Sequence, residues 1–166
     1  MKHLIFLALL TLTLVADECP TLDQIKNTQS PLEMYQKLPA CFEAKRYDDA
    51  VNLYLISQAY GKYDTLRVSD KTAHQAIAVL RMSISSMIGT EQITEFQNAL
   101  KPHINDRTQI CSVLKKLGKP DYHPSYMINH GLKAFDGPQL NGGINTDFQP
   151  EIAWQETLQR YMKCTQ

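Results

Sequence analysis

The sequence places two histidines and two aspartates within one short stretch, DYHPSYMINHGLKAFDG, which runs from Asp121 to Gly137. Imidazole and carboxylate side chains are the groups that bind zinc and that act as general acids and bases. Three hypotheses follow for this stretch. It is a metal site, a catalytic site, or a packed segment in which the histidines have no chemical role.

The spacing of the two histidines argues against a shared metal ion. His123 and His130 are seven residues apart, which on an unbroken helix separates them by about 10.5 Å along the axis. Zinc–nitrogen bonds of about 2.0–2.1 Å cannot bridge that separation, whereas an i,i+4 pair can meet at one ion. Pro124 also biases His123 away from helical geometry. We therefore predict no metal site and no cofactor.

Packing accounts for the stretch better, because most of its other residues are apolar or aromatic. His130 follows Tyr126 by four residues, a spacing that brings two side chains together on a helix. Gly131 indicates a close approach to another element. We expect a short packed helix in which His130 contributes to stability and His123 contributes less.

Patterns of other catalytic or ligand-binding sites are absent from the sequence. The serines lack a Gly-x-Ser-x-Gly setting, and the glycines of residues 130–143 follow no predicted strand, so they do not indicate a phosphate-binding loop. The segment NGGINTD, residues 141–147, lacks the acidic spacing of a calcium loop. We predict that the protein is not an enzyme. The enzymatic alternative is a small hydrolase that uses His130 with Asp121 or Asp136.

The charge balance excludes one class of partner. The chain has 17 basic and 17 acidic residues, so it lacks the positive surplus with which proteins neutralise nucleic-acid phosphates. We expect no nucleic-acid partner.

The first 16 residues have the layout of a secretory signal peptide. Lys2 supplies a positive charge, Leu4 to Val15 form an apolar and hydroxyl-bearing run, and Ala16 offers a small residue for cleavage. The run is shorter than the roughly 20 residues that span a bilayer. We expect cleavage after Ala16, export without stable membrane insertion, and a single helical domain over residues 17–166.

Four cysteines follow the predicted cleavage site, and an even number in an exported protein indicates two disulfide bonds. They are Cys19, Cys41, Cys111 and Cys164. No two lie within four residues of each other, which excludes the usual zinc spacings. Three pairings are open. We favour Cys19–Cys41 and Cys111–Cys164, in which each bond ties an end of the chain to the nearest cysteine.

Apolar residues recur at three- and four-residue steps along most of the chain, as in helices packed on one face. Residues 47–63 are apolar on nearly all sides and predict a central helix. Residues 69–89 form the clearest amphipathic pattern, with Ser69 or Asp70 as N-cap and Gly89 as stop. Further helices are predicted over 30–38, with Ser30 as N-cap and a restart after Pro39, and over 90–102, 105–120 and 150–164. In the last helix, five residues are expected to pack inward: Ile152, Ala153, Leu158, Tyr161 and Met162. No segment alternates as a strand does, so the predicted fold is all-α, with about six or seven helices.

Two resemblances accompany these patterns. Residues 40–64, ACFEAKRYDDAVNLYLISQAYGKYD, resemble one tetratricopeptide-type helical hairpin at Tyr47, Ala50, Tyr54 and Ser57. The pattern does not recur one repeat later, so we expect a single hairpin and no solenoid. The segments HPSYMINHGLKAF and YMKC are similar to small exported proteins of Gram-negative bacteria whose activity is uncharacterised. That resemblance implies residence in the periplasm and implies no activity.

A disulfide-linked helical domain without a catalytic pattern fits a protein or peptide binder. One such role in the periplasm is immunity, in which the protein neutralises a toxin. The alternative is an assembly or chaperone-like subunit that holds a peptide in the groove of the hairpin. Loops on rigid scaffolds and exposed aromatic side chains often carry recognition. The candidate contact residues are Tyr122, Tyr126, His130, Phe135, Asn141 and Phe148.

Overall fold

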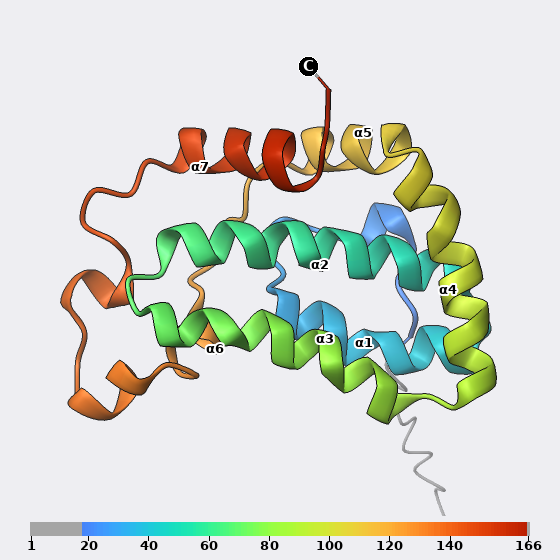
Figure 1. Ribbon diagram of the computed structural model, residues 1–166, viewed down its shortest axis with the longest axis horizontal. Helices are drawn as coiled ribbons and strands as arrows, with labels where there is room; N and C mark the ends of the chain where they lie inside the picture. Colours follow the sequence, from blue (N-terminus) through green and yellow to red (C-terminus); the bar gives the residue numbers. More distant parts are fainter. Residues whose placement is uncertain (1–17, 166) are drawn as a thin grey trace, which may run out of the picture.

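The computed structural model describes residues 18–165, and this part of the chain folds into an arrangement of helices (Figure 1). The α-helices are α1 (Pro31–Glu43), α2 (Tyr47–Arg67), α3 (Ala76–Met87), α4 (Thr90–Asn105), α5 (Thr108–Leu117), α6 (Ser125–Ile128) and α7 (Pro150–Glu156). Shorter helical turns are η1 (Leu22–Gln24), η2 (Lys71–Gln75), η3 (Leu132–Asp136), η4 (Leu140–Gly143) and η5 (Thr157–Tyr161). The predicted all-α class is confirmed. The predicted signal peptide, residues 1–16, lies outside the described residues.

Helix α2 is the centre of the fold, as its apolar surface predicts. Of its 21 residues, 14 are buried. It contacts α1, α3, α4, α5 and α7. Figure 1 shows α5 and α7 on one side of α2 and α3 on the other, with α4 crossing near the N-terminal end of α2. No described helix has the length and apolar character that a membrane crossing needs.

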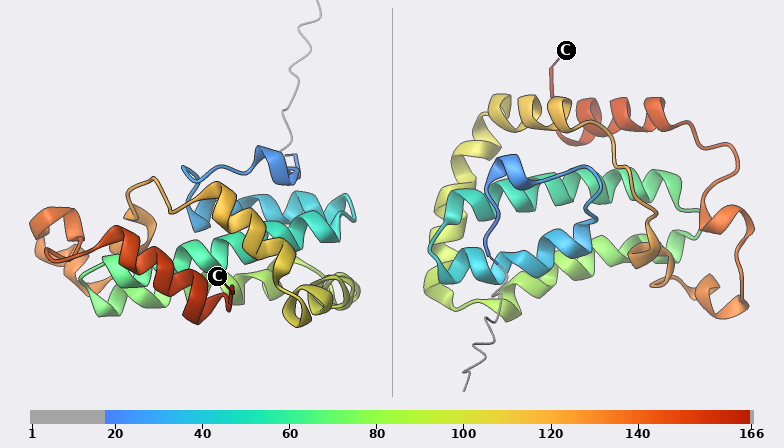
Figure 2. Two further views of the ribbon diagram at one scale, coloured as in Figure 1. Left: turned by 90° about the horizontal axis from the view of Figure 1, so that it is seen from above. Right: turned by 180° about the vertical axis from the view of Figure 1, so that it is seen from behind.

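Helix α1 packs beside α2 as the first arm of a hairpin (Figure 2). It begins as predicted, with Ser30 as N-cap and a reciprocal hydrogen bond from the Ser30 N–H to the Glu33 carboxylate. The predicted interruption at Pro39 is wrong, because α1 continues through Pro39 to Glu43. Leu38, Cys41 and Phe42 on either side of the proline are fully buried. Their burial outweighs the hydrogen bond that proline cannot make.

The boundaries of α3 and α4 differ from the prediction by a few residues. Asp70 is the N-cap, and its Oδ1 accepts a hydrogen bond from the Thr72 N–H, but the first turn is the 3₁₀ turn η2 and α3 starts at Ala76. Gly89 serves as N-cap of α4. Helix α4 also passes the predicted end at Pro102 and reaches Asn105.

The expected inner face of the last helix is confirmed at Ala153, Leu158 and Met162 and is wrong at Ile152 and Tyr161. Ile152, Ala153, Leu158, Tyr161 and Met162 were expected to pack inward. Ile152 is 60% exposed and Tyr161 is 39% exposed, whereas Trp154 is buried between the rings of Tyr60 and Tyr63. The segment η5 is a π-helical turn, in which the Met162 N–H donates to the Thr157 carbonyl. The wider turn rotates Tyr161 away from the core.

Both disulfide bonds form with the predicted pairing. Cys19 bonds to Cys41, with the Cα atoms 4.5 Å apart, and Cys111 bonds to Cys164, with the Cα atoms 5.5 Å apart. The first bond holds the segment before α1 against that helix. The second holds the segment after η5 against α5.

Candidate functional site

A buried ion cluster joins the end of α2 to the stretch with which the sequence analysis began. Asp64 is fully buried, and its Oδ1 lies 2.8 Å from Nε and 2.7 Å from Nη2 of Arg67. Its Oδ2 accepts hydrogen bonds from the hydroxyls of Tyr122, at 2.9 Å, and Tyr126, at 2.8 Å. The Arg67 guanidinium also lies over the rings of Tyr63 and Tyr122. Both carboxylate oxygens are therefore satisfied inside the protein.

The electrostatics of this cluster are dominated by desolvation. Burial raises the pKa of Asp64 to about 6, although Arg67 and the two tyrosine hydroxyls oppose the rise. Burial and the adjacent Asp64 charge likewise raise the pKa of Tyr126 and of Tyr122. Because the carboxyl group is fully buried, it has no surface on which to meet a substrate. The cluster anchors residues 122–126 to α2 and is part of the scaffold.

The structure reverses the roles expected of the two histidines. His130 is exposed, so the prediction that it is packed is wrong. His123 is also exposed, but its Nδ1 lies 2.9 Å from the Ser125 hydroxyl and its Nε2 lies 3.0 Å from the Gly142 carbonyl. The 3₁₀ and turn geometry after Ile128 directs His130 outward. His123 is therefore the histidine that connects two parts of the chain.

In the described part of the chain, His130 lies apart from the two aspartates that the hydrolase alternative requires. Within residues 18–165, no hydrogen bond joins His130 to Asp121 or Asp136, and all three residues are exposed. The same residues contain no group of three or more His, Cys, Asp or Glu side chains that could hold a metal ion.

Residues 131–143 contain two of the candidate contact residues, Phe135 and Asn141, and are here named the recognition segment after that sequence prediction. The segment is held to the scaffold at both ends. Near its start, the Leu132 N–H donates to the Thr72 hydroxyl and the Lys133 N–H donates to Asp70 Oδ2. The predicted close approach at Gly131 is confirmed, because a Cβ atom there would overlap Asp70 Oδ2 and the Ala73 Cβ.

The far end of the recognition segment is fixed by backbone hydrogen bonds. The Ser69 N–H donates to the Gly143 carbonyl at 2.9 Å, and the Asn145 N–H donates to the Arg67 carbonyl at 2.8 Å. His123 contacts Gly142 in the same turn. Figure 1 shows η3 and η4 at one end of the molecule, beyond the C-terminal end of α2.

The recognition segment displays large apolar side chains to solvent. Phe135 is 87% exposed, Leu140 is 89% exposed and Leu132 is 67% exposed. Sequence reasoning selected Phe135 but missed the two leucines. Leu140 lies in a stretch rich in proline, asparagine and glycine, where an apolar residue has no core to join. The position of Leu140 in such a stretch was the sequence feature from which its exposure could have been predicted.

The other candidate contact residues are less accessible to a partner, because they are partly buried or already hydrogen-bonded. Tyr122 and Tyr126 are half-buried, with their hydroxyls committed to Asp64. Phe148 is half-buried, with its ring edge-on to Tyr63 at 5.5 Å. Asn141 is exposed in a left-handed backbone conformation, and its side-chain amide donates to the Ile144 carbonyl. Of the six candidates, Phe135, Asn141 and His130 lie at the surface.

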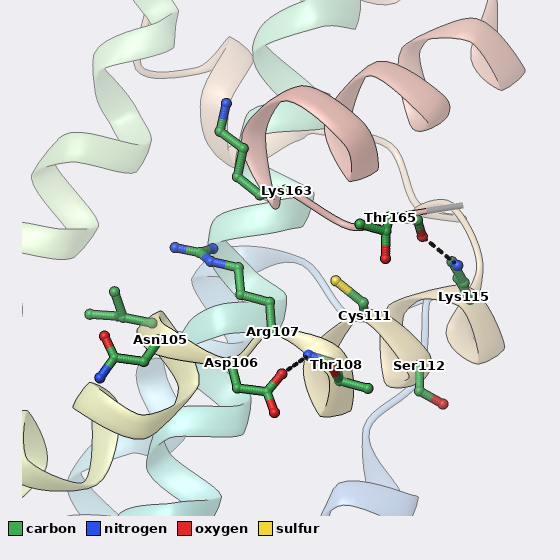
Figure 3. Close-up of a pocket in the computed structure, with 10 residues that line it drawn as sticks. Asn105, Asp106, Arg107, Thr108, Cys111, Ser112, Lys115, Lys163 and Thr165 are labelled. Carbon is green, nitrogen blue, oxygen red and sulfur yellow. Dashed lines mark hydrogen bonds between the residues drawn. The ribbon is translucent and has the colours of Figure 1, made fainter.

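A separate cavity of about 740 Å³, here named the disulfide cavity, lies beside the Cys111–Cys164 bond (Figure 3). Its lining includes Arg107, Lys115 and Lys163 and one carboxylate, Asp106. Asp106 Oδ1 accepts a hydrogen bond from the Thr108 N–H at the start of α5. Lys115 donates to the backbone carbonyl of Thr165, which fixes the end of the described chain against α5. The cavity is therefore predominantly positive.

Comparison of the chain with protein-family models, curated proteins and solved structures found no match.

Proposed function

We propose that the protein is an exported, periplasmic binding protein that recognises a folded protein partner through the recognition segment. One observation supports this proposal most directly. Phe135 and Leu140 are almost fully exposed on a backbone that is hydrogen-bonded to the scaffold at both ends. Exposed apolar side chains of this size mark interaction sites when they are gathered in one segment.

The fixed backbone is important for affinity. A flexible loop loses conformational entropy when a partner orders it, and that loss reduces the binding free energy. The bonds from Lys133 to Asp70 and from Ser69 to Gly143 place this cost on folding instead. A large aromatic side chain presented in this way is the usual form of an interface hot spot.

The finer role that we propose is immunity, the neutralisation of a toxin in the periplasm. The two disulfide bonds support an oxidising compartment. A small, rigid binder that carries its anchors on protruding turns suits the occlusion of a partner's pocket. A peptide-holding assembly subunit would use a groove. A pocket of about 380 Å³ does lie in the recognition segment, but Phe135 and Leu132 are not among the residues that line it and are 87% and 67% exposed.

The test begins by identifying the partner. A photo-crosslinking amino acid is placed at position 135 in the full chain, expressed in Gram-negative cells, and the adducts are identified by mass spectrometry. The matched control is position 82, because Met82 is 72% exposed on α3, away from the recognition segment. We expect one dominant adduct at 135 that is absent at 82.

The purified partner then allows a quantitative test. Phe135→Ser or Leu140→Ser should each weaken binding by about tenfold or more, as loss of an interface anchor does, while Met82→Ser should leave affinity unchanged. Immunity further requires that co-expression of the chain restores growth to cells that export the partner. If Phe135→Ser binds the partner as tightly as the wild type does, the proposed role of the recognition segment is refuted. Failure to restore growth would refute the immunity role alone.

A further inference from the structure

A small cavity of about 220 Å³, here named the arginine pocket, lies where α2 meets α3, the end of α4 and η5. Its polar lining comes from Tyr54, Gln58, Arg81, Arg107 and Tyr161, and the remaining lining is apolar, contributed by α2, α4 and Met162. Two guanidinium groups and a partly apolar wall suit an anion that is attached to an apolar group.

The two arginines are not neutralised by the protein. Arg81 is the only charged residue of α3, and neither Arg81 nor Arg107 belongs to an ion pair within residues 18–165. Arg107 makes only a long hydrogen bond of 3.4 Å to the Met162 carbonyl. None of the residues that line the pocket is an aspartate or glutamate. A planar guanidinium is the side chain best suited to bind a carboxylate through two parallel hydrogen bonds.

The floor of the pocket is fixed before any ligand arrives. Gln58 is 5% exposed, its amide donates to the Tyr35 hydroxyl, and its Oε1 accepts from the Tyr161 hydroxyl at 3.4 Å. The Tyr54 ring stands edge-on to Tyr35 and to Phe96. Burial raises the pKa of Tyr54, and the nearby Arg81 charge opposes that rise.

The π-helical turn η5 is the feature that places Tyr161 in this lining. Such turns are rare, and in proteins they frequently lie at functional sites. Here the turn leaves Tyr161 39% exposed on the wall of the pocket and keeps Met162 buried beneath it.

The size of the pocket and its neighbour indicate what kind of molecule fits. Sites for drug-sized ligands enclose about 300–1,000 Å³, so a pocket of about 220 Å³ accommodates one side chain and a small anion. The pocket shares Ile104 and Arg107 with the disulfide cavity, so the two cavities lie next to each other at the α4–α5 junction. The disulfide cavity adds Lys115 and Lys163 against the single carboxylate of Asp106.

We propose that the arginine pocket binds the C-terminal carboxylate of a polypeptide whose last side chain is apolar, and that the disulfide cavity holds the acidic residues that precede it. Arg81 and Arg107 receive the carboxylate, and the apolar wall receives the last side chain. The two adjacent cavities provide the path of the preceding chain. This site is separate from the recognition segment and does not depend on it.

The experiment uses the oxidised protein and a fluorescein-labelled peptide, Glu-Glu-Asp-Gly-Ala-Leu, with a free C-terminal carboxylate. Binding is followed by fluorescence anisotropy. The same peptide with a C-terminal amide is the ligand control. We expect the carboxylate peptide to bind at least tenfold more tightly than the amide, and more weakly as salt is raised.

Variants assign the binding to the pocket. Arg81→Gln and Arg107→Gln should each weaken binding about tenfold or more, and Arg81→Lys should give an intermediate loss because it keeps the charge without the planar fork. Lys71→Gln is the matched control, since Lys71 is an exposed cation outside both cavities. Phe135→Ser should bind the peptide as the wild type does, which separates this site from the recognition segment. Circular dichroism and melting of each variant confirm that it is folded.

Three results would overturn the proposal. The first is equal affinity for the carboxylate and amide peptides, and the second is the absence of binding at millimolar peptide. The third is tighter binding of an amidated phosphoserine peptide than of the carboxylate peptide, which would make the pocket a phosphate site.

Discussion

At the scale of single residues, Asp64 is the most constrained group in the described structure. Four donor contacts from Arg67, Tyr122 and Tyr126 surround its carboxylate, yet desolvation is strong enough to raise its pKa to about 6. A buried carboxyl of this kind costs stability while it is ionised and costs less once it is protonated.

The pH dependence of stability follows from that shift. Between pH 7 and pH 5 the native carboxyl takes up a proton that the unfolded chain, with a pKa near 3.8, does not. The contribution of Asp64 to the free energy of unfolding should therefore increase as the pH falls, by at most about 1.4 kcal/mol per pH unit. This contribution is measured by urea unfolding of the wild type and of Asp64→Asn at each pH. The contribution of histidine titration is the same in both proteins, so it cancels in the difference between their free energies of unfolding. A difference that shrinks toward pH 5 would show that Arg67 and the hydroxyls outweigh desolvation.

The size of the Asp64→Asn effect is a separate prediction. The substitution keeps the shape of the side chain but leaves the Arg67 guanidinium, whose side chain is 10% exposed, without a counter-charge. Because desolvation outweighs the Arg67 charge at this carboxyl, loss of the negative charge costs little by itself. We expect a loss of about 1–3 kcal/mol at pH 7, because the amide nitrogen, a donor, replaces a carboxylate oxygen that accepts from other buried donors. Asp49→Asn is the control, since Asp49 pairs with Arg46 near the surface and should cost about 1 kcal/mol or less. Similar losses in the two variants, measured by urea unfolding, would contradict the buried-pair interpretation.

The two histidines provide a third test at this scale. His123→Ala removes the contacts with Ser125 and Gly142 and should cost about 1 kcal/mol. His130→Ala removes an exposed side chain that makes no hydrogen bond within residues 18–165, and should change the free energy of unfolding by less than about 0.5 kcal/mol. Thermal melts of both variants measure these losses of stability. A larger loss for His130→Ala than for His123→Ala would support the packing hypothesis.

At the scale of elements, Gly131 determines how closely the recognition segment approaches η2. Gly131→Ala would push a methyl group against Asp70 Oδ2, which holds the Lys133 N–H, and against Ala73. We expect a loss of about 1–3 kcal/mol from this overpacking. Asn129→Ala, two residues earlier at an exposed position, should have little effect. Equal melting temperatures for the two variants would mean that the segment can shift to accommodate the methyl group.

Most elements could be predicted from the sequence because the signals were local. The Ser30 cap, the Asp70 cap, the close approach at Gly131 and the apolar surface of α2 all depend on neighbouring residues. The continuation of α1 through Pro39, the exposed Ile152 and the exposed Tyr161 could not be predicted, because the burial of Phe42, the fit of Trp154 and the π-helical turn depend on distant contacts. The Asp64 cluster was missed for the same reason, since Asp64 and Tyr122 are 58 residues apart.

At the scale of the whole molecule, the disulfide bonds close loops of different length. The paired cysteines are separated by 53 residues in one bond and by 22 in the other. The chain-entropy estimate is about 4 kcal/mol for the longer loop and about 3 kcal/mol for the shorter. Cys111 of the longer bond also lines the disulfide cavity, so under the proposed peptide site loss of this bond should weaken peptide binding as well as stability.

Removal of each bond tests this ranking. The pair Cys111→Ser and Cys164→Ser should lower the free energy of unfolding somewhat more than the pair Cys19→Ser and Cys41→Ser. Loss of the Cys111–Cys164 bond should also weaken binding of the carboxylate peptide, whereas loss of the Cys19–Cys41 bond should leave that binding unchanged. Urea unfolding and anisotropy measure the two effects. Loss of peptide binding in both pairs at a temperature where both are folded would contradict the assignment of the cavity.

The pairing of the cysteines also has a consequence for biogenesis. The bonds join the first cysteine to the second and the third to the fourth, so neither loop contains a cysteine of the other. If the chain crosses a membrane N-terminus first, Cys19 and Cys41 can be oxidised together before Cys111 emerges. An oxidant that joins cysteines in their order of arrival then makes the native bonds directly, and maturation of this protein should not require a disulfide isomerase.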